Sequence, residues 1–150
     1  MIDTSANAVA GTFAVGTSPT SVAVRPNGQS IYVGCAGSGT VEVHGPSGNL
    51  AATIGGFIYP KSIALTPDGS RAHVVNENGS TVSVIATGSN SVVPPIPVGL
   101  LPSSVAISAD GSTAYVTNQY GLSLSVINTA VNSVTTIARI GVHPFQVAVH

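Results

Sequence analysis

The sequence predicts an all-β fold built from repeated four-stranded antiparallel sheets. Three observations indicate this: a motif that recurs about every 42 residues, a hairpin turn after each of the first three motifs, and short apolar strands separated by loops rich in glycine, asparagine and serine. A fixed period of this length determines the architecture, because each repeat is one supersecondary unit that buries its apolar surface against its neighbours.

Each repeat opens with a proline and an apolar strand. The prolines stand 41, 42 and 42 residues apart in four copies of the motif: Pro19–Val24, Pro60–Leu65, Pro102–Ile107 and Pro144–Val149. Sequences such as Val-Ala-Val and Ile-Ala-Leu are apolar on both faces of a strand, so both faces must be covered. We therefore expect these strands to be the innermost of each sheet.

A tight turn follows the first three of these strands. The turns read Pro26-Asn27-Gly28, Pro67-Asp68-Gly69 and Ala109-Asp110-Gly111. Proline fixes φ at the first turn position, Asn or Asp suits the second, and glycine accepts the left-handed conformation that closes the turn. The sequence thus predicts three β-hairpins.

Three further strands complete each repeat. The predicted second strands are 31–33, 72–75 and 114–117, the third are 40–43, 81–85 and 123–127, and the fourth are 50–54, 92–98 and 134–140. One fourth strand carries Pro94, Pro95 and Pro97. Proline cannot donate to a sheet ladder, so we place the fourth strand at the outer rim.

Twisted sheets of this kind, stacked face to face with the first strand innermost, form a β-propeller. The 150 residues divide into an outer strand of a preceding blade (1–16, with the strand at Val9–Val15), three complete blades (17–56, 57–99 and 100–141), and an inner strand of a following blade (142–150). Known propellers have about four to eight blades. We expect this chain not to close a ring alone.

The third repeat contains Tyr115-Val116-Thr117-Asn118, preceded by the Pro102 motif and followed by Val126-Ile127-Asn128-Thr129. This unit resembles the YVTN-family β-propeller repeat, and the resemblance covers nearly the whole chain, although the other copies depart from it at Tyr32–Cys35 and His73–Asn76. It implies a propeller of about six to eight blades of the kind found in surface-layer and other cell-surface proteins of archaea and bacteria.

Composition excludes several classes of partner. The chain has four basic and five acidic residues and a net charge of −1, so there is no basic surface for nucleic acid. No apolar run approaches the roughly 18 residues of a membrane span. Polar residues are mostly serine, threonine and asparagine, which favours an extracellular or cell-surface location. Asn78-Gly79-Ser80 matches the glycosylation acceptor pattern on a predicted loop.

The chain shows no catalytic motif and no metal-ligand spacing. Two of its five carboxylates, Asp68 and Asp110, are explained by the hairpin turns. His44, His73, His143 and His150 fall at different repeat positions, so we interpret them as packed or surface imidazoles. We expect no catalytic residue, cofactor or metal, and we expect a protein partner: further copies of the chain, as an oligomer or filament, or the remainder of a longer propeller.

Two surfaces are candidates for function. Loops that join a rim strand to the next inner strand share one face with the loops between second and third strands, and they carry apolar residues that either bind a partner protein or plug the contacts between blades. These residues are Phe57, Ile58, Tyr59, Leu100, Leu101, Tyr120, His143 and Phe145.

The second candidate surface is a central channel lined by the ends of the inner strands. Arg25, Thr66, Ser108 and His150 occupy equivalent positions there but differ in chemistry. The leading hypothesis is a non-catalytic structural or interaction module of a cell-surface assembly. The alternative is part of an extracellular or periplasmic propeller enzyme or ligand-binding protein, with its site at the channel.

Overall fold

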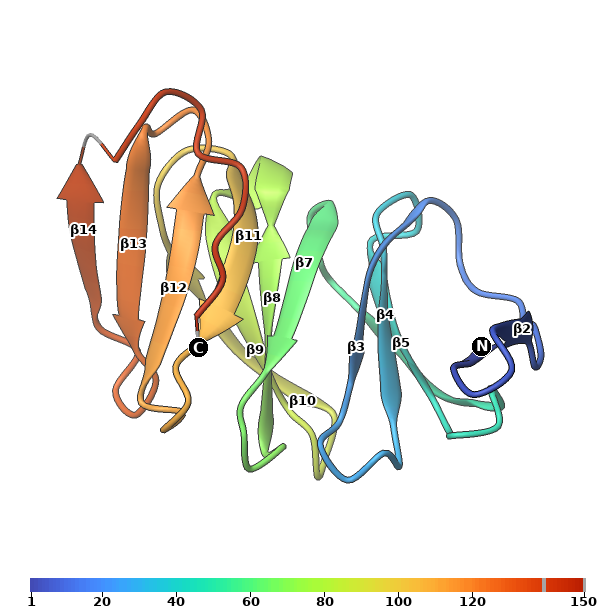
Figure 1. The fold of residues 1–150 in the computed structure, drawn as a ribbon. Helices are drawn as coiled ribbons and strands as arrows, with labels where there is room; N and C mark the ends of the chain where they lie inside the picture. Colours follow the sequence, from blue (N-terminus) through green and yellow to red (C-terminus); the bar gives the residue numbers. More distant parts are fainter. Residues whose placement is uncertain (139, 150) are drawn as a thin grey trace.

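The computed structural model describes residues 1–138 and 140–149, which form three four-stranded antiparallel sheets and one two-stranded sheet (Figure 1). Blade 1 consists of β3 (Pro19–Val24), β4 (Ile31–Cys35), β5 (Thr40–His44) and β6 (Leu50–Gly55). Blade 2 consists of β7 (Pro60–Leu65), β8 (Arg71–Asn76), β9 (Thr81–Ala86) and β10 (Ser91–Pro97). Blade 3 consists of β11 (Pro102–Ile107), β12 (Thr113–Asn118), β13 (Ser123–Asn128) and β14 (Val134–Ala138).

Within each blade the strands are hydrogen-bonded in chain order, so every blade is a simple meander. The blades stand side by side like wedges and do not close into a ring (Figure 1). The predicted fold is therefore confirmed: these are propeller blades with one strand of each blade innermost. None of the described residues belongs to a helix long and apolar enough to cross a membrane.

The hairpin turns form as predicted. Gly28, Gly69 and Gly111 have φ values of 71°, 67° and 74°, which a residue without a side chain adopts most easily. Each of these glycines donates its N–H to the carbonyl three residues earlier, at 2.7 Å in blade 1 and 2.8 Å in blades 2 and 3. The turns thus fix the end of each inner strand.

A second left-handed position recurs without glycine. The residue before each repeat proline has a positive φ, at 51°, 58°, 46° and 53° in Ser18, Tyr59, Leu101 and His143. Such a conformation costs roughly 1 kcal/mol or more for a residue with a side chain. Neighbouring loops hold it in place, because the carbonyls of Ser18, Tyr59 and Leu101 accept the N–H groups of Ala36, Glu77 and Gln119.

The prolines of β10 lie at a sheet edge, as predicted. Among the described strands, β10 pairs only with β9, and the register shifts between Val93 and Ile96, where Pro94 and Pro95 interrupt the ladder. Proline has no N–H to donate, and the shift in register leaves Pro94 and Pro95 out of the ladder.

Two apolar clusters fill the contacts between blades. The cluster between blades 1 and 2, hereafter seam 1–2, includes Tyr32, Val41, Ile63 and Val74. The cluster between blades 2 and 3, hereafter seam 2–3, includes Val75, Val82, Val105 and Val116. Each blade therefore buries one face against the next blade, as the sequence predicts for sheets that are apolar on both faces.

A hydroxyl ladder joins the inner strands across the seams. Ser21 Oγ accepts the N–H of Ile63 at 3.0 Å, and Ser62 Oγ accepts that of Val105 at 3.3 Å. Thr20 Oγ1 also donates to the carbonyl of Pro60 at 2.5 Å. These bonds satisfy two inner-strand N–H groups and one inner-strand carbonyl that would otherwise lack a partner in the seams.

The two ends of the chain differ from the prediction in detail. Ile2–Asp3 (β1) pairs with Ala8–Val9 (β2), but the outer strand expected at Val9–Val15 does not continue past Val9. An outer strand is held by the third strand of its blade, and β1 supplies only two residues of one. The following segment instead places the Phe13 ring 4.8 Å from the His44 ring of blade 1.

The C-terminal segment 142–149 likewise forms no ladder. It nevertheless follows the path of an inner strand, because Ser103 Oγ donates to the Phe145 carbonyl at 2.7 Å and Val147 N–H donates to Ser104 Oγ at 3.5 Å. These two bonds repeat the hydroxyl contacts between inner strands that are seen in seams 1–2 and 2–3. No described strand pairs with this segment, so it forms no sheet ladder.

Candidate functional site

The two sets of loops that carry the candidate apolar residues lie together at one end of the blades, since their carbonyls and amides hydrogen-bond to each other. Phe57 is not part of that surface. Its side chain is 6% exposed and belongs to the apolar cluster of seam 1–2, so the interpretation as a plug between blades is the correct one at this position. Its N–H donates to the Gly39 carbonyl at 3.2 Å, which turns the ring inward.

Other members of the loop face are exposed. Ile58, Leu100, Tyr120 and Phe145 are each more than half exposed. Tyr59 is 38% exposed, Leu101 is half-buried and His143 is exposed. They remain candidates for contact with a partner protein.

Two local contacts order this face. The Tyr120 and His143 rings meet edge to face with centroids 5.3 Å apart. Lys61 Nζ lies 3.3 Å from Glu77 Oε1 and 5.7 Å from the centre of the Tyr59 ring. The exposed glycosylation pattern at Asn78 lies beside this pair, in a short 3-10 turn (η1, Glu77–Gly79).

The predicted channel residues lie at the opposite ends of the blades. Arg25, Thr66 and Ser108 each follow an inner strand directly and accept the closing turn amide through their carbonyls. His150 falls outside the described residues. Of the three described residues, Thr66 borders a cavity that lies between two blades.

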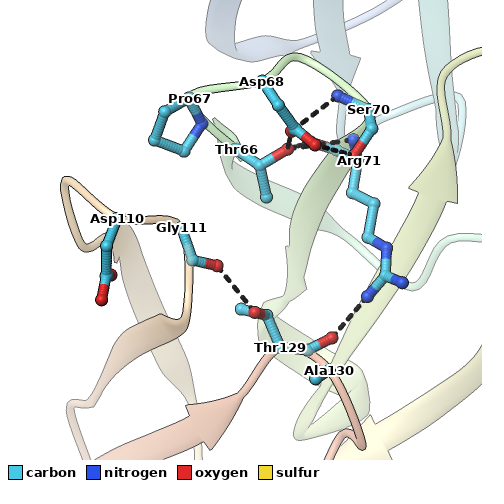
Figure 2. A pocket seen from close by; sticks show the side chains of 9 residues that line it. All are labelled: Thr66, Pro67, Asp68, Ser70, Arg71, Asp110, Gly111, Thr129 and Ala130. Carbon is cyan, nitrogen blue, oxygen red and sulfur yellow. Dashed lines mark hydrogen bonds between the residues drawn. The ribbon is translucent and has the colours of Figure 1, made fainter.

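This cavity, hereafter the groove, has a volume of about 400 Å³ and lies between the hairpin turns of blades 2 and 3 (Figure 2). It is bordered by side chains from those two turns, from the start of β8 and from the loop after β13. The lining residues are Thr66, Pro67, Asp68, Ser70, Arg71, Asp110, Gly111, Thr129 and Ala130.

Arg71 and Asp110 stand on opposite sides of the groove in Figure 2, with Thr129 between them at its base. Arg71 Nη1 donates to the Thr129 carbonyl across the seam, and Thr129 Oγ1 donates to the Gly111 carbonyl at 2.7 Å. The first of these hydrogen bonds joins blades 2 and 3 at the groove, and the second lies within blade 3.

Both carboxylates of the groove are fixed by their own turns. The Thr66 hydroxyl donates to Asp68 Oδ1 at 2.5 Å, and the Ser108 hydroxyl donates to Asp110 Oδ1 at 2.6 Å. Hydrogen bonds from these hydroxyls, followed by those from Ser70 and Ser112, lower the pKa of each carboxyl from 3.8 to about 2. At neutral pH both groups are ionised and act only as acceptors.

The histidines in the described part of the chain are packed or exposed, as predicted. His44 is buried, with Nε2 3.0 Å from Glu42 Oε2 and Nδ1 3.1 Å from the Gly48 carbonyl. His73 is completely buried, and neither ring nitrogen has a hydrogen-bond partner among the residues that the structure describes. Burial, aided by the positive charge of Arg71, lowers the pKa of His73 from 6.5 to about 4.

Within residues 1–138 and 140–149, no group of three histidine, cysteine, aspartate or glutamate side chains is placed to hold a metal ion. Cys35 is a buried thiol, and burial is the main cause of its raised pKa. It fills the place that Asn76 and Asn118 occupy in blades 2 and 3, where each amide donates to two serine or threonine hydroxyls.

Sequence reasoning missed the groove. Its residues come from segments roughly 40 to 60 positions apart, and each of them looks like an ordinary turn residue. One feature of the sequence could have indicated the groove. At one repeat position blade 1 has the long, charged Arg25, whereas blade 2 has the short Thr66.

Comparison with known proteins supports the fold. No protein-family model and no curated protein sequence matches the chain. Among solved structures, the chain is similar to hydrazine synthase of Kuenenia stuttgartiensis (25% identity, TM-score 0.81), with 93% of this chain and 41% of that chain covered.

Two further solved structures are also similar to this chain in fold. The WD40 repeats of RRP9 match at 18% identity and a TM-score of 0.76, with 84% of this chain and 40% of that chain covered. A functionally unknown protein from Desulfotomaculum acetoxidans matches at 24% identity and a TM-score of 0.76, with 91% of this chain and 46% of that chain covered. The chain spans less than half the length of these three structures, and the likeness establishes a β-propeller fold.

Proposed function

We propose that this chain is a non-catalytic structural or interaction module of a cell-surface or extracellular assembly. Further blades, from other copies of the chain or from additional polypeptide, would cover its two flanks. The resemblance of Tyr115-Val116-Thr117-Asn118 to the YVTN repeat of surface-layer-like propellers, and a polar surface made mainly of uncharged residues, support the setting.

One observation carries the proposal. Val22, Ile63 and Val105 occupy the same position in three inner strands, yet Val22 is 65% exposed whereas Ile63 is 7% and Val105 is 6% exposed. The latter two pack against the blade before them. Val22 faces the place of a preceding blade, and Val24 on the same face is also more than half exposed.

Such a flank is costly in water. Full burial of one valine side chain is worth roughly 1.5 kcal/mol or more, and an inner strand also leaves outward amides unpaired. A second blade on β3 would repeat the contacts already seen in seams 1–2 and 2–3. The exposed Leu100, Tyr120 and Phe145 of the loop face offer an additional contact for a protein partner.

Light scattering of the purified chain tests the proposal. We expect a mass of at least twice the 14.8 kDa of one chain. Val22→Lys should lower that mass, because a charge would be buried in the new contact. Val131→Lys is the matched control, since Val131 is 70% exposed in the loop after β13. A stable, well-folded monomer of the natural sequence would contradict the proposal.

A further inference from the structure

The groove is open in one seam and filled in the other. In seam 1–2, Arg25 lies across the turn of blade 2: its Nε donates to the Gly69 carbonyl at 3.0 Å, and its Cγ would come within 3.1 Å of a Cβ added at Gly69. In seam 2–3 the equivalent residue is Thr66, whose hydroxyl turns back to Asp68. The space that the Arg25 side chain fills in one seam therefore forms the groove in the other.

The walls of the groove offer both donors and acceptors. The Arg71 guanidinium has five N–H groups, and among the described residues only the Thr129 carbonyl accepts from it. Asp68 Oδ2 accepts one protein hydrogen bond, from Ser70 Oγ at 2.7 Å, and Asp110 Oδ2 accepts one, from Ser112 Oγ at 2.9 Å. Each of these oxygens keeps a lone pair for a ligand.

The groove also has an apolar side, made by the Pro67 ring and the Ala130 methyl group. It continues past Arg71, because Arg71 and Ala130 also border a second cavity of about 210 Å³ next to Val84, Val93 and Asn132. Together the two cavities suit a small molecule that is longer than a single ring.

From these features we propose that the groove binds a neutral saccharide. A sugar hydroxyl donates to a carboxylate and accepts from a guanidinium, so hydroxyls at the two ends of one saccharide would satisfy Asp110 and Arg71, which stand on opposite sides of the groove. The C–H face of the ring packs on Pro67 and Ala130. Two carboxylates against one guanidinium disfavour an anionic ligand, and a small zwitterion has no apolar face to cover Pro67.

This inference is separate from the proposed function, because it needs only blades 2 and 3 and no second chain. Nuclear magnetic resonance of the ¹⁵N-labelled protein tests it, with maltose and cellobiose as probes and glycine and glycerol as comparison solutes. We expect one disaccharide to cause saturable shifts in the amides of Ser70, Arg71, Gly111 and Ala130, whereas glycerol causes none.

Two variants localise the binding. Thr66→Arg places in blade 2 the side chain that fills seam 1–2, and should weaken binding by at least about tenfold. Asp110→Asn keeps the turn, because Asn27 already occupies this position in blade 1, and should weaken binding by removing the carboxylate acceptor. Leu50→Arg, which adds an arginine on the exposed outer strand of blade 1 and outside the lining of the groove, is the control and should bind as the natural sequence does.

Three results would overturn the inference. The first is the absence of saturable shifts with either disaccharide at tens of millimolar sugar. The second is equal sugar binding by the natural sequence, Thr66→Arg and Asp110→Asn. The third is a response of the groove amides to glycine instead of the sugars, which would assign the groove to zwitterions.

Discussion

Seams 1–2 and 2–3 are built from the same repeat but differ in their side chains. Seam 1–2 buries the Tyr32 ring and is crossed by Arg25. Seam 2–3 buries His73, whose ring has no hydrogen-bond partner within 1–138 and 140–149, and leaves the groove open beside Thr66. The strands and turns are nearly identical in both seams, so the blade scaffold fixes the backbone while single side chains decide which seam is filled and which is pH-sensitive.

The largest expected effect is a difference in the free energy of unfolding between a substitution in seam 1–2 and one on the exposed face of β3. Ile63→Ala should lower the free energy of unfolding by about 4 kcal/mol, because it removes three carbons from the buried cluster of seam 1–2. Val22→Ala, at the same repeat position, should change it by about 0.5 kcal/mol or less in a dilute, dissociated sample. Urea unfolding measures both; equal losses would contradict the contrast.

Seam 2–3 should weaken in mild acid through His73. The native imidazole takes up a proton only near pH 4, whereas the unfolded one does so near 6.5, so between these values the unfolded state binds more protons. Stability should fall as the pH drops from 6.5 to 4, by about 3 kcal/mol in total. Urea unfolding at several pH values measures this loss.

Two variants assign that acid sensitivity. His73→Phe removes the titrating ring and should abolish the loss between pH 6.5 and 4. His143→Gln removes an exposed histidine and should leave the loss unchanged. An acid profile that is the same with and without His73 would show that seam 2–3 is no more pH-sensitive than seam 1–2.

A smaller effect is expected when the filled seam is opened. Arg25→Thr removes the hydrogen bond to the Gly69 carbonyl and should cost about 1 kcal/mol, since the guanidinium is only half-buried. The variant should also acquire a groove like that of seam 2–3. A crystal structure of the variant in which seam 1–2 stays closed would show that the length of this side chain does not control the groove.

The smallest effect concerns the turn carboxylates. Asp68 and Asp110 have folded pKa values of about 2, below the usual 3.8, so the stability they provide is complete above about pH 4 and is lost as the pH falls toward 2. Asp68→Asn combined with Asp110→Asn should flatten the stability profile in this range. The equivalent turn of blade 1 has Asn27 in place of an aspartate, so this turn position contributes nothing to the pH dependence there.

The regular parts of the fold followed from the sequence because they depend on local chemistry. The turn glycines and the rim prolines Pro94 and Pro95 act through their own φ values and donors, which are readable without a structure. The ends were less predictable, because whether residues 10–15 or 144–149 form a ladder depends on a pairing strand that is not present beside them.

The site was harder to predict for a physical reason. Phe57 and Ile58 are adjacent and both apolar, but only the backbone path decides that the first enters seam 1–2 and the second faces solvent. The left-handed conformation of Tyr59 and Leu101 carries no glycine to mark it. The groove depends on Arg71 and Asp110 meeting across two blades, which no local pattern encodes.

The central claim is that every inner strand is completed by the blade before it, so that β3 is left open. Amide hydrogen exchange at Val22, Ile63 and Val105 in a dilution series tests it most directly. The Ile63 and Val105 amides, held by Ser21 and Ser62 of the same chain, should stay protected at every concentration, while protection at Val22 should fall as the assembly dissociates. Protection at Val22 that equals the other two and does not change with dilution would contradict the account.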